Sequence, residues 1–218
     1  MQTHKIFLVD DHPLVREWLA NLLHQQQDLA VCGETDNVEA ALQEICAAQP
    51  EVAIVDLSLS SGWGLDLIRQ LSQQAPETRI IVLSMHDEKL YAERSMRAGA
   101  RGYVMKRETA KVIVGAIRQV LRGEVYLSSG LQAAMARNVA SGRKSAVISP
   151  VATLSDRELE VFRLMGQGVP TRQIAHSIGV SVKTVHTYHA RMREKFRVAN
   201  LSELVREAVR WCESETRG

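Results

Sequence analysis

Residues 5–13 read KIFLVDDHP, and this stretch decides the fold of the first half of the chain. An apolar run ends abruptly in two adjacent carboxylates, Asp10 and Asp11, which gain no stability from lying side by side. Four more short apolar runs follow, at residues 29–33, 52–55, 79–84 and 102–105. The stretches between the runs have the apolar spacing of helices. This alternation predicts a doubly wound α/β domain with a five-stranded parallel sheet covered on both faces.

Polar side chains follow four of the five predicted strands. A doubly wound sheet binds ligands at the carboxyl ends of its strands, and a flavodoxin-like strand order would gather Asp10, Asp11, Asp56, Ser84 and Lys106 at one edge. Three carboxylates this close repel one another unless a cation shares the site, and Mg²⁺ prefers oxygen ligands. Asp56 is therefore a candidate nucleophile towards a phosphoryl group, and Lys106 would neutralise charge on the transferred oxygens.

The first half of the chain carries a set of motifs found together in a known family. The motifs that match in order and spacing are the acid pair, VD at residues 55–56, VLS at 82–84 and YVMK at 103–106. In these the chain resembles the receiver domain of two-component response regulators, which has a CheY-like fold. The resemblance implies a bound Mg²⁺ or Mn²⁺ ion. Asp11 and Asp56 would bind it directly, Asp10 through water and Ser58 through its backbone carbonyl.

The same resemblance implies how the site works. Asp56 would be the phosphoacceptor, and the phosphoryl group would come from a sensor histidine kinase. Ser84 and Lys106 would contact the phosphoryl group, and Tyr103 would be an aromatic switch that turns inward when Ser84 moves. Apart from its own phosphorylation and dephosphorylation, such a protein is not an enzyme.

Composition and charge narrow the class of protein further. The 218 residues allow two domains, and the acidic residues outnumber the basic ones only in the first 124. No apolar run reaches the roughly 20 residues of a membrane helix, and the N-terminus lacks a leader pattern, so we expect a cytoplasmic protein without a membrane partner. Cys32, Cys46 and Cys212 have neither disulfide nor zinc spacing.

The chain divides into three predicted segments. Residues 1–124 form the receiver, residues 125–152 form a linker with a short helix, and residues 153–218 form an all-α domain of four helices. Ser155 and Glu158 predict a capping box at the start of the first of these helices. A short second helix, a turn with glycine and a longer basic third helix are the parts of a helix-turn-helix.

The third helix, residues 181–196, is expected to present a basic and polar face. The residues expected to point inward are Val182, Val185, Tyr188, Met192 and Phe196. The residues expected to face DNA are Lys183, Thr184, His186, Thr187, Ala190, Arg191 and Arg193. Cations would hold phosphates, His186 and Thr187 would reach base edges, and Ala190 would touch a thymine methyl group.

Residues 154–208 are also similar to a known family, the LuxR-type DNA-binding domain. Its attachment to a receiver indicates a response regulator of the NarL/FixJ class, which binds double-stranded promoter DNA. The last helix has more apolar side chains than a small bundle easily buries, and we expect Leu201, Leu204, Val205 and Ala208 to form a homodimer when the protein is phosphorylated. The alternative is ordinary packing against the bundle, which would account for about half of the apolar residues of this helix.

Three other interpretations fit parts of the sequence. A Mg²⁺-dependent phosphatase or hydrolase would use the same carboxylates but leaves the second domain without a role. A helical protein-interaction module would account for the basic helix without DNA. A transcription factor that binds an autoinducer would need an enclosed apolar cavity in place of the acidic cluster, and the first half of the chain favours the acidic cluster.

Overall fold

The computed structural model describes residues 3–141 and 149–217. The chain forms two compact units, Met1–Ala136 and Arg137–Gly218. The predicted linker, residues 125–152, is therefore shared between them, and its stretch 142–148 lies outside the described residues.

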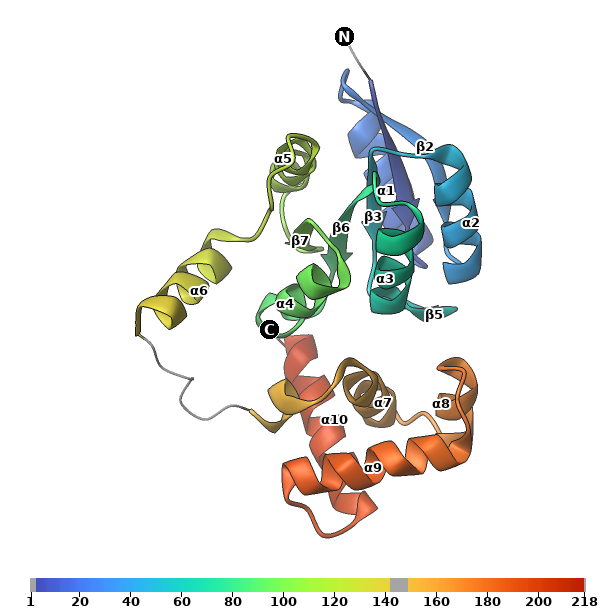
Figure 1. Ribbon diagram of the computed structural model, residues 1–218, viewed down its shortest axis with the longest axis vertical. Helices are drawn as coiled ribbons and strands as arrows, with labels where there is room; N and C mark the ends of the chain where they lie inside the picture. Colours follow the sequence, from blue (N-terminus) through green and yellow to red (C-terminus); the bar gives the residue numbers. More distant parts are fainter. Residues whose placement is uncertain (1–2, 142–148, 218) are drawn as a thin grey trace. The chain divides into compact units, whose positions relative to one another are not determined.

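Strands and helices alternate through the first unit, as predicted (Figure 1). The strands of its main sheet are β1 (His4–Val9), β2 (Leu29–Thr35), β3 (Val52–Val55), β6 (Arg79–Ser84) and β7 (Gly102–Met105). The helices between and after them are α1 (Pro13–His24), α2 (Val38–Ala48), α3 (Gly64–Gln74), α4 (Glu88–Ala98) and α5 (Ala110–Leu121). Neighbouring strands are parallel in the order β2-β1-β3-β6-β7, which confirms the flavodoxin-like prediction.

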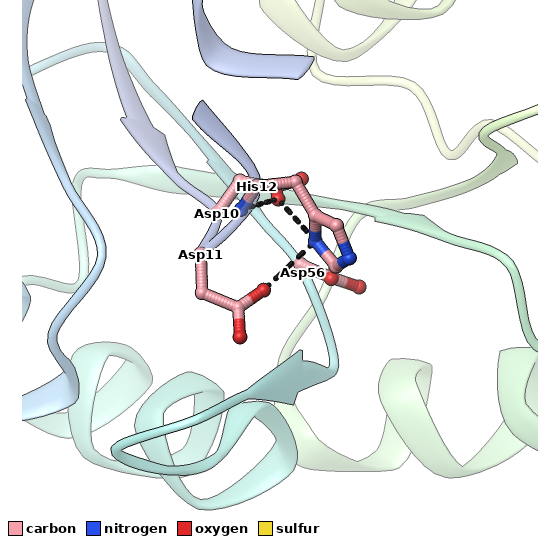
Figure 2. Close-up of side chains that lie close together, drawn as sticks. All are labelled: Asp10, Asp11, His12 and Asp56. Carbon is pink, nitrogen blue, oxygen red and sulfur yellow. Dashed lines mark hydrogen bonds and ion pairs between the residues drawn. The ribbon is translucent and has the colours of Figure 1, made fainter. Parts of the chain in front are cut away.

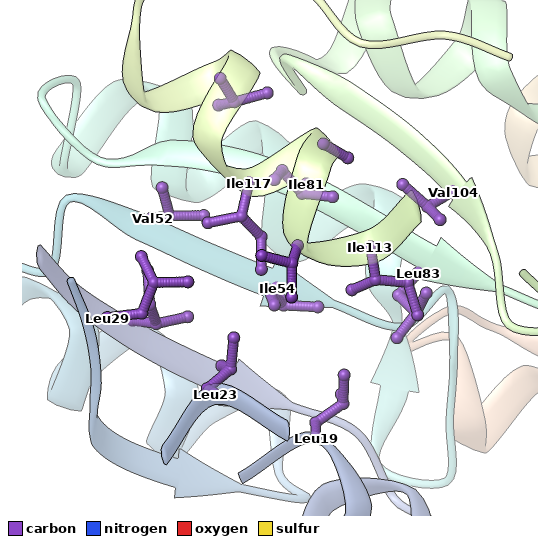
Figure 3. Close-up of a cluster of buried hydrophobic side chains, with 14 of the residues drawn as sticks. Leu19, Leu23, Leu29, Val52, Ile54, Ile81, Leu83, Val104, Ile113 and Ile117 are labelled. Carbon is purple, nitrogen blue, oxygen red and sulfur yellow. The ribbon is translucent and has the colours of Figure 1, made fainter. Parts of the chain in front are cut away.

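The core of this unit lies on both faces of the sheet. On one face, side chains of α1 and α5 pack on alternate strand residues, as Figure 3 shows for Leu19, Leu23, Ile113 and Ile117. The intervening strand residues are equally buried, because successive side chains of a strand point to opposite faces. Both faces are thus apolar, which leaves the strand ends as the place for polar chemistry.

Local sequence signals fix the segments around those strand ends. Pro13 opens α1 two residues after Asp11, and the side chain of Asn37 caps α2 by accepting from two backbone N–H groups. After β3, the strands β4 (Ser58–Leu59) and β5 (Gly62–Trp63) form a short antiparallel hairpin. A Cβ atom at Gly64 would clash with the backbone oxygen of Asp56, so this position requires glycine for α3 to begin against the end of β3.

The segment after α5 is hydrogen-bonded to the sheet. The Tyr126 backbone N–H donates to Arg101 at 2.9 Å, and its carbonyl accepts from Tyr103 at 3.1 Å, which extends the edge beside β7. The Ser128 hydroxyl then donates to the Glu88 carboxylate at 2.7 Å. Helix α6 (Ser129–Ser141) follows, and it lies within residues 125–152, where a linker with a short helix was predicted.

The second unit contains the four predicted helices. They are α7 (Asp156–Gly166), α8 (Thr171–Ser177), α9 (Val182–Phe196) and α10 (Leu201–Arg217), preceded by the short 3₁₀ helix η1 (Pro150–Thr153). The capping box of Ser155 and Glu158 is present, and Lys195 of α9 adds an ion pair to Glu158. Within residues 3–141 and 149–217, we find no helix long and apolar enough to cross a membrane.

Candidate functional site

The carboxyl ends of β1 and β3 bring three carboxylates together (Figure 2). Asp10 and Asp56 are each only 3% exposed, whereas Asp11 is half-buried. One carboxylate oxygen of Asp11 accepts from the backbone N–H of Ser60 at 2.9 Å, which ties the acid pair to the β4–β5 hairpin. The predicted convergence of these residues on one sheet edge is thus present in the geometry.

Lys106 completes this acidic cluster from the end of β7. Its Nζ lies 2.7 Å from Asp10 Oδ2 and 2.8 Å from Asp56 Oδ2. Burial alone would lower the pKa of Lys106, but the Asp56 and Asp10 carboxylates outweigh this and raise the pKa. The lysine therefore stays charged and neutralises part of the buried negative charge.

Burial also shapes the behaviour of Asp56. Desolvation raises the pKa of Asp56, and the opposing charge of Lys106 only partly compensates. A further cation near the carboxylate would favour its charged and nucleophilic form. The three carboxylates of the cluster offer oxygen ligands, which fits a hard divalent ion such as Mg²⁺ or Mn²⁺.

His12 is a member of the cluster that sequence reasoning missed. Its Nδ1 lies 2.8 Å from Asp11 Oδ1 and 3.1 Å from Asp10 Oδ1 (Figure 2). One ligand atom from each of Asp10, Asp11, His12 and Asp56 lies within 4.8 Å of the others. The sequence feature that could have predicted this is the position of His12 directly after the acid pair. The turn into α1 at this point directs the imidazole ring back to the carboxylates.

Ser84 and Tyr103 meet at the loop after β6. Ser84 is fully buried, and its hydroxyl accepts from the backbone N–H of His86 at 3.2 Å. The Tyr103 hydroxyl donates to the backbone carbonyl of His86 at 2.8 Å. The Ser84 carbonyl accepts from the Lys106 N–H at 2.8 Å, which places Ser84 beside the lysine of the acidic cluster.

The predicted DNA-facing residues all lie on α9, with different exposure. Lys183, His186, Thr187 and Arg191 are exposed. The other three, Thr184, Ala190 and Arg193, are half-buried. Ser181 and Thr184 share a hydroxyl hydrogen bond of 2.8 Å, and Arg193 donates to the Ala199 carbonyl at 3.4 Å, so these two side chains also stabilise the ends of the helix.

One part of the helix-face prediction for α9 was wrong. Val182 was expected inward but is exposed, whereas His189, which the prediction left out, is buried. The inward row on α9 runs through Val185, His189 and Met192, whereas Val182 is the first residue of the helix and is 38% exposed. Burial lowers the pKa of His189 to about 4, so this histidine is neutral at physiological pH.

The four residues proposed for dimerisation divide into two pairs. Leu204 and Ala208 are fully buried in the helical unit, where α10 packs on α7 and α9, so they belong to its core. They cannot serve a partner chain without unfolding this core, and this part of the prediction is corrected. Leu201 is 40% exposed and Val205 is half-buried, which leaves these two for an interface.

Comparisons with known proteins agree with this architecture. The response regulator receiver domain family matches residues 6–118, and the luxR family of bacterial regulatory proteins matches residues 152–208. The oxygen regulatory protein NreC of Staphylococcus haemolyticus is 32% identical over 210 residues, which are 94% of this chain and 97% of that protein. The response regulator UvrY of Escherichia coli K12 is 32% identical over 213 residues, 97% of each chain.

Solved structures show the same fold. A two-component response regulator of the LuxR family from Aurantimonas sp. is 30% identical, with a TM-score of 0.59, and covers 66% of this chain and 100% of its own. RcsB of Salmonella enterica serovar Typhimurium, bound to the promoter rprA, has a TM-score of 0.71 at 24% identity and covers 94% of this chain and 98% of its own.

A receiver with an acidic strand-end cluster, followed by a helix-turn-helix unit, defines a signalling protein that regulates transcription rather than a conventional enzyme. The chain belongs to the two-component response regulators of the NarL/FixJ family, which join a receiver domain to a LuxR-type DNA-binding domain.

Proposed function

We propose that Asp56 accepts a phosphoryl group from a sensor histidine kinase and that this switches the binding of promoter DNA. The observation that carries the proposal is the buried Lys106, whose ammonium bridges Asp10 and Asp56 at the edge where the acid pair lies. An oxygen of Asp56 would attack the phosphorus of a phosphohistidine, the P–N bond would break, and the leaving imidazole would take up a proton.

The side chains around Asp56 would divide the work of this reaction. Asp10, Asp11, Asp56 and the backbone carbonyl of Ser58 would hold Mg²⁺ or Mn²⁺, which neutralises phosphoryl oxygens when it is bound. Lys106 would pair with the phosphoryl group, and the buried Ser84 hydroxyl would turn towards it and release the His86 N–H. Tyr103 would then move together with the loop between β6 and α4, because its hydroxyl is hydrogen-bonded to the His86 carbonyl in that loop.

DNA binding and dimerisation are proposed to use α9 and α10. The exposed Lys183 and Arg191 would hold phosphates while His186 and Thr187 reach base edges in the major groove, with Thr184, Ala190 and Arg193 at the margin of the contact. Leu201 and Val205 would form a homodimer, whose two-fold symmetry predicts an inverted-repeat operator. The proposal is supported by the RcsB structure, which is described as bound to a promoter in the presence of a phosphomimetic. Because the proposed partner is promoter DNA, we also propose that the protein acts in the cytoplasm.

The proposed phosphorylation is tested by intact mass after incubation with Mg²⁺ and acetyl phosphate. We expect the wild type to gain one phosphoryl group, and only when Mg²⁺ is present. Asp56→Asn should gain none, whereas Asp36→Asn, a control at an exposed aspartate, should behave as the wild type does. Equal phosphorylation of Asp56→Asn and the wild type would overturn the assignment of the phosphoacceptor.

A further inference from the structure

One half-buried side chain joins the two loops that flank the phosphorylation site. His86 lies in the loop between β6 and α4, and its Nε2 forms a hydrogen bond of 2.6 Å with the Ser58 hydroxyl. Ser58 begins the β4–β5 hairpin, only two residues after Asp56. A contact between loops 28 positions apart in the sequence holds the two strand ends at a fixed spacing.

The backbone of the same residue is bonded to both proposed switch side chains. The His86 N–H donates to the Ser84 hydroxyl at 3.2 Å, and the His86 carbonyl accepts from the Tyr103 hydroxyl at 2.8 Å. His86 is therefore bonded to Ser58 through its ring and to Ser84 and Tyr103 through its main chain. A shift of any one of these three partners changes a hydrogen bond of His86.

The imidazole ring is held in place by aromatic neighbours. Its centroid lies 4.6 Å from the Tyr91 ring at an interplanar angle of 31°, and 6.3 Å from the Trp63 ring at 59°. Tyr91 and Trp63 also pack edge to face with centroids 6.1 Å apart, and both side chains are buried. Because such packing restricts rotation of the ring, a hydrogen bond made by Nε2 can fix the position of Ser58.

We propose that His86 is a positioning residue that couples the metal-binding loop to the switch. By holding the Ser58 side chain, it orients the segment whose backbone carbonyl is proposed to face the metal, and its main chain relates that orientation to Ser84 and Tyr103. This inference rests on the proposed function, since it assigns a role within the same site. It predicts that metal affinity depends on side chains that do not touch the metal.

The test measures Mn²⁺ binding to the full chain by following the electron paramagnetic resonance signal of the free ion. Ser58→Ala and His86→Phe each remove the hydrogen bond, and the phenylalanine keeps an aromatic ring beside Tyr91 and Trp63. Each should weaken Mn²⁺ binding about fivefold, the usual worth of one hydrogen bond. The double variant should bind Mn²⁺ no more weakly than either single variant, because both substitutions delete the same hydrogen bond.

Two further variants distinguish positioning from a general loss of structure. His86→Gln keeps an amide that can bond to Ser58, and it should restore most of the Mn²⁺ affinity. Tyr103→Phe removes only the hydroxyl bonded to the His86 carbonyl, and it should weaken Mn²⁺ binding about twofold in the wild type but not in the Ser58→Ala background.

The outcomes separate the inference from the proposed function. Unchanged Mn²⁺ affinity in Ser58→Ala and His86→Phe, or losses that multiply in the double variant, would overturn the role of His86 alone. Wild-type protein that binds no Mn²⁺, or binding that survives Asp11→Asn, would overturn the proposed metal site together with the inference.

Discussion

The acidic edge of the receiver and the outer face of α9 are both charged, yet they are built in opposite ways. At the sheet edge, Asp10, Asp56 and Lys106 follow three different strands and contact one another, with both carboxylates buried and the lysine side chain 8% exposed. On α9, Lys183, His186 and Arg191 come from one continuous helix and are exposed. Buried charges must be compensated within the protein, whereas exposed charges remain available for an external partner.

The largest effect is expected at the buried lysine. Lys106→Met leaves the Asp10 and Asp56 carboxylates buried without their shared cation, and should lower the free energy of unfolding by about 3 kcal/mol in the absence of a metal. Urea unfolding monitored by circular dichroism measures this, and Mg²⁺ should recover part of the loss. The exposed Lys89→Met is the matched control. Equal stability of the two variants would show that the lysine does not compensate buried charge.

Substitutions of a buried and of an exposed residue on α10 should differ almost as much in their effect on stability. Leu204→Ala removes a fully buried side chain and should destabilise the second unit by about 3 kcal/mol, whereas Leu201→Ala, at a 40% exposed position, should cost less than about 1 kcal/mol. Thermal unfolding provides the comparison. We expect Leu201→Ala instead to weaken dimerisation in sedimentation experiments, and similar melting temperatures for the two variants would contradict the division of this helix.

The buried histidine of α9 predicts a dependence on pH. Because the pKa of His189 is lowered from 6.5 to about 4 in the folded state, the unfolded state binds the proton first as pH falls. The stability that His189 contributes is full above pH 6.5 and is lost between about pH 6.5 and 4, by on the order of 3 kcal/mol. His189→Leu should flatten this part of the stability profile in thermal melts. An unchanged profile would show that His189 does not titrate in this range.

The smallest effect is expected at a single exposed cation of α9. Lys183→Ala should weaken binding to duplex DNA severalfold and reduce the slope of log affinity against log salt concentration by about 1, since one phosphate contact is lost. Lys111→Ala, at an exposed position on α5, is the control. Fluorescence anisotropy at several salt concentrations measures both. The same slope for Lys183→Ala and the wild type would remove this residue from the proposed DNA contact.

The sequence predicted the sheet edge well because topology constrains it. Apolar runs at 52–55, 79–84 and 102–105 became β3, β6 and β7, and a flavodoxin-like order then leaves little freedom for the residues that follow them. His12 and His86 escaped prediction because their contacts depend on the exact path of two loops, which strand periodicity does not encode.

The helical unit was predicted in its elements but less well in its faces. The turn signals and the capping box located all four helices, yet the inward row of α9 begins at Val185 rather than Val182 and includes His189, which the prediction left out. Leu204 and Ala208 show the same limit, since an apolar stripe does not say whether its residues pack within the bundle or against a second chain.

The central claim is that a phosphoryl group on Asp56 controls DNA binding by α9. The most direct measurement is the affinity of the full chain for a duplex selected from a random pool by the phosphorylated protein, with and without Mg²⁺ and acetyl phosphate. We predict that the wild type binds this duplex at least tenfold more tightly when it is phosphorylated, and that Asp56→Asn shows no such gain. The same gain in Asp56→Asn, or none in fully phosphorylated wild type, would contradict the claim.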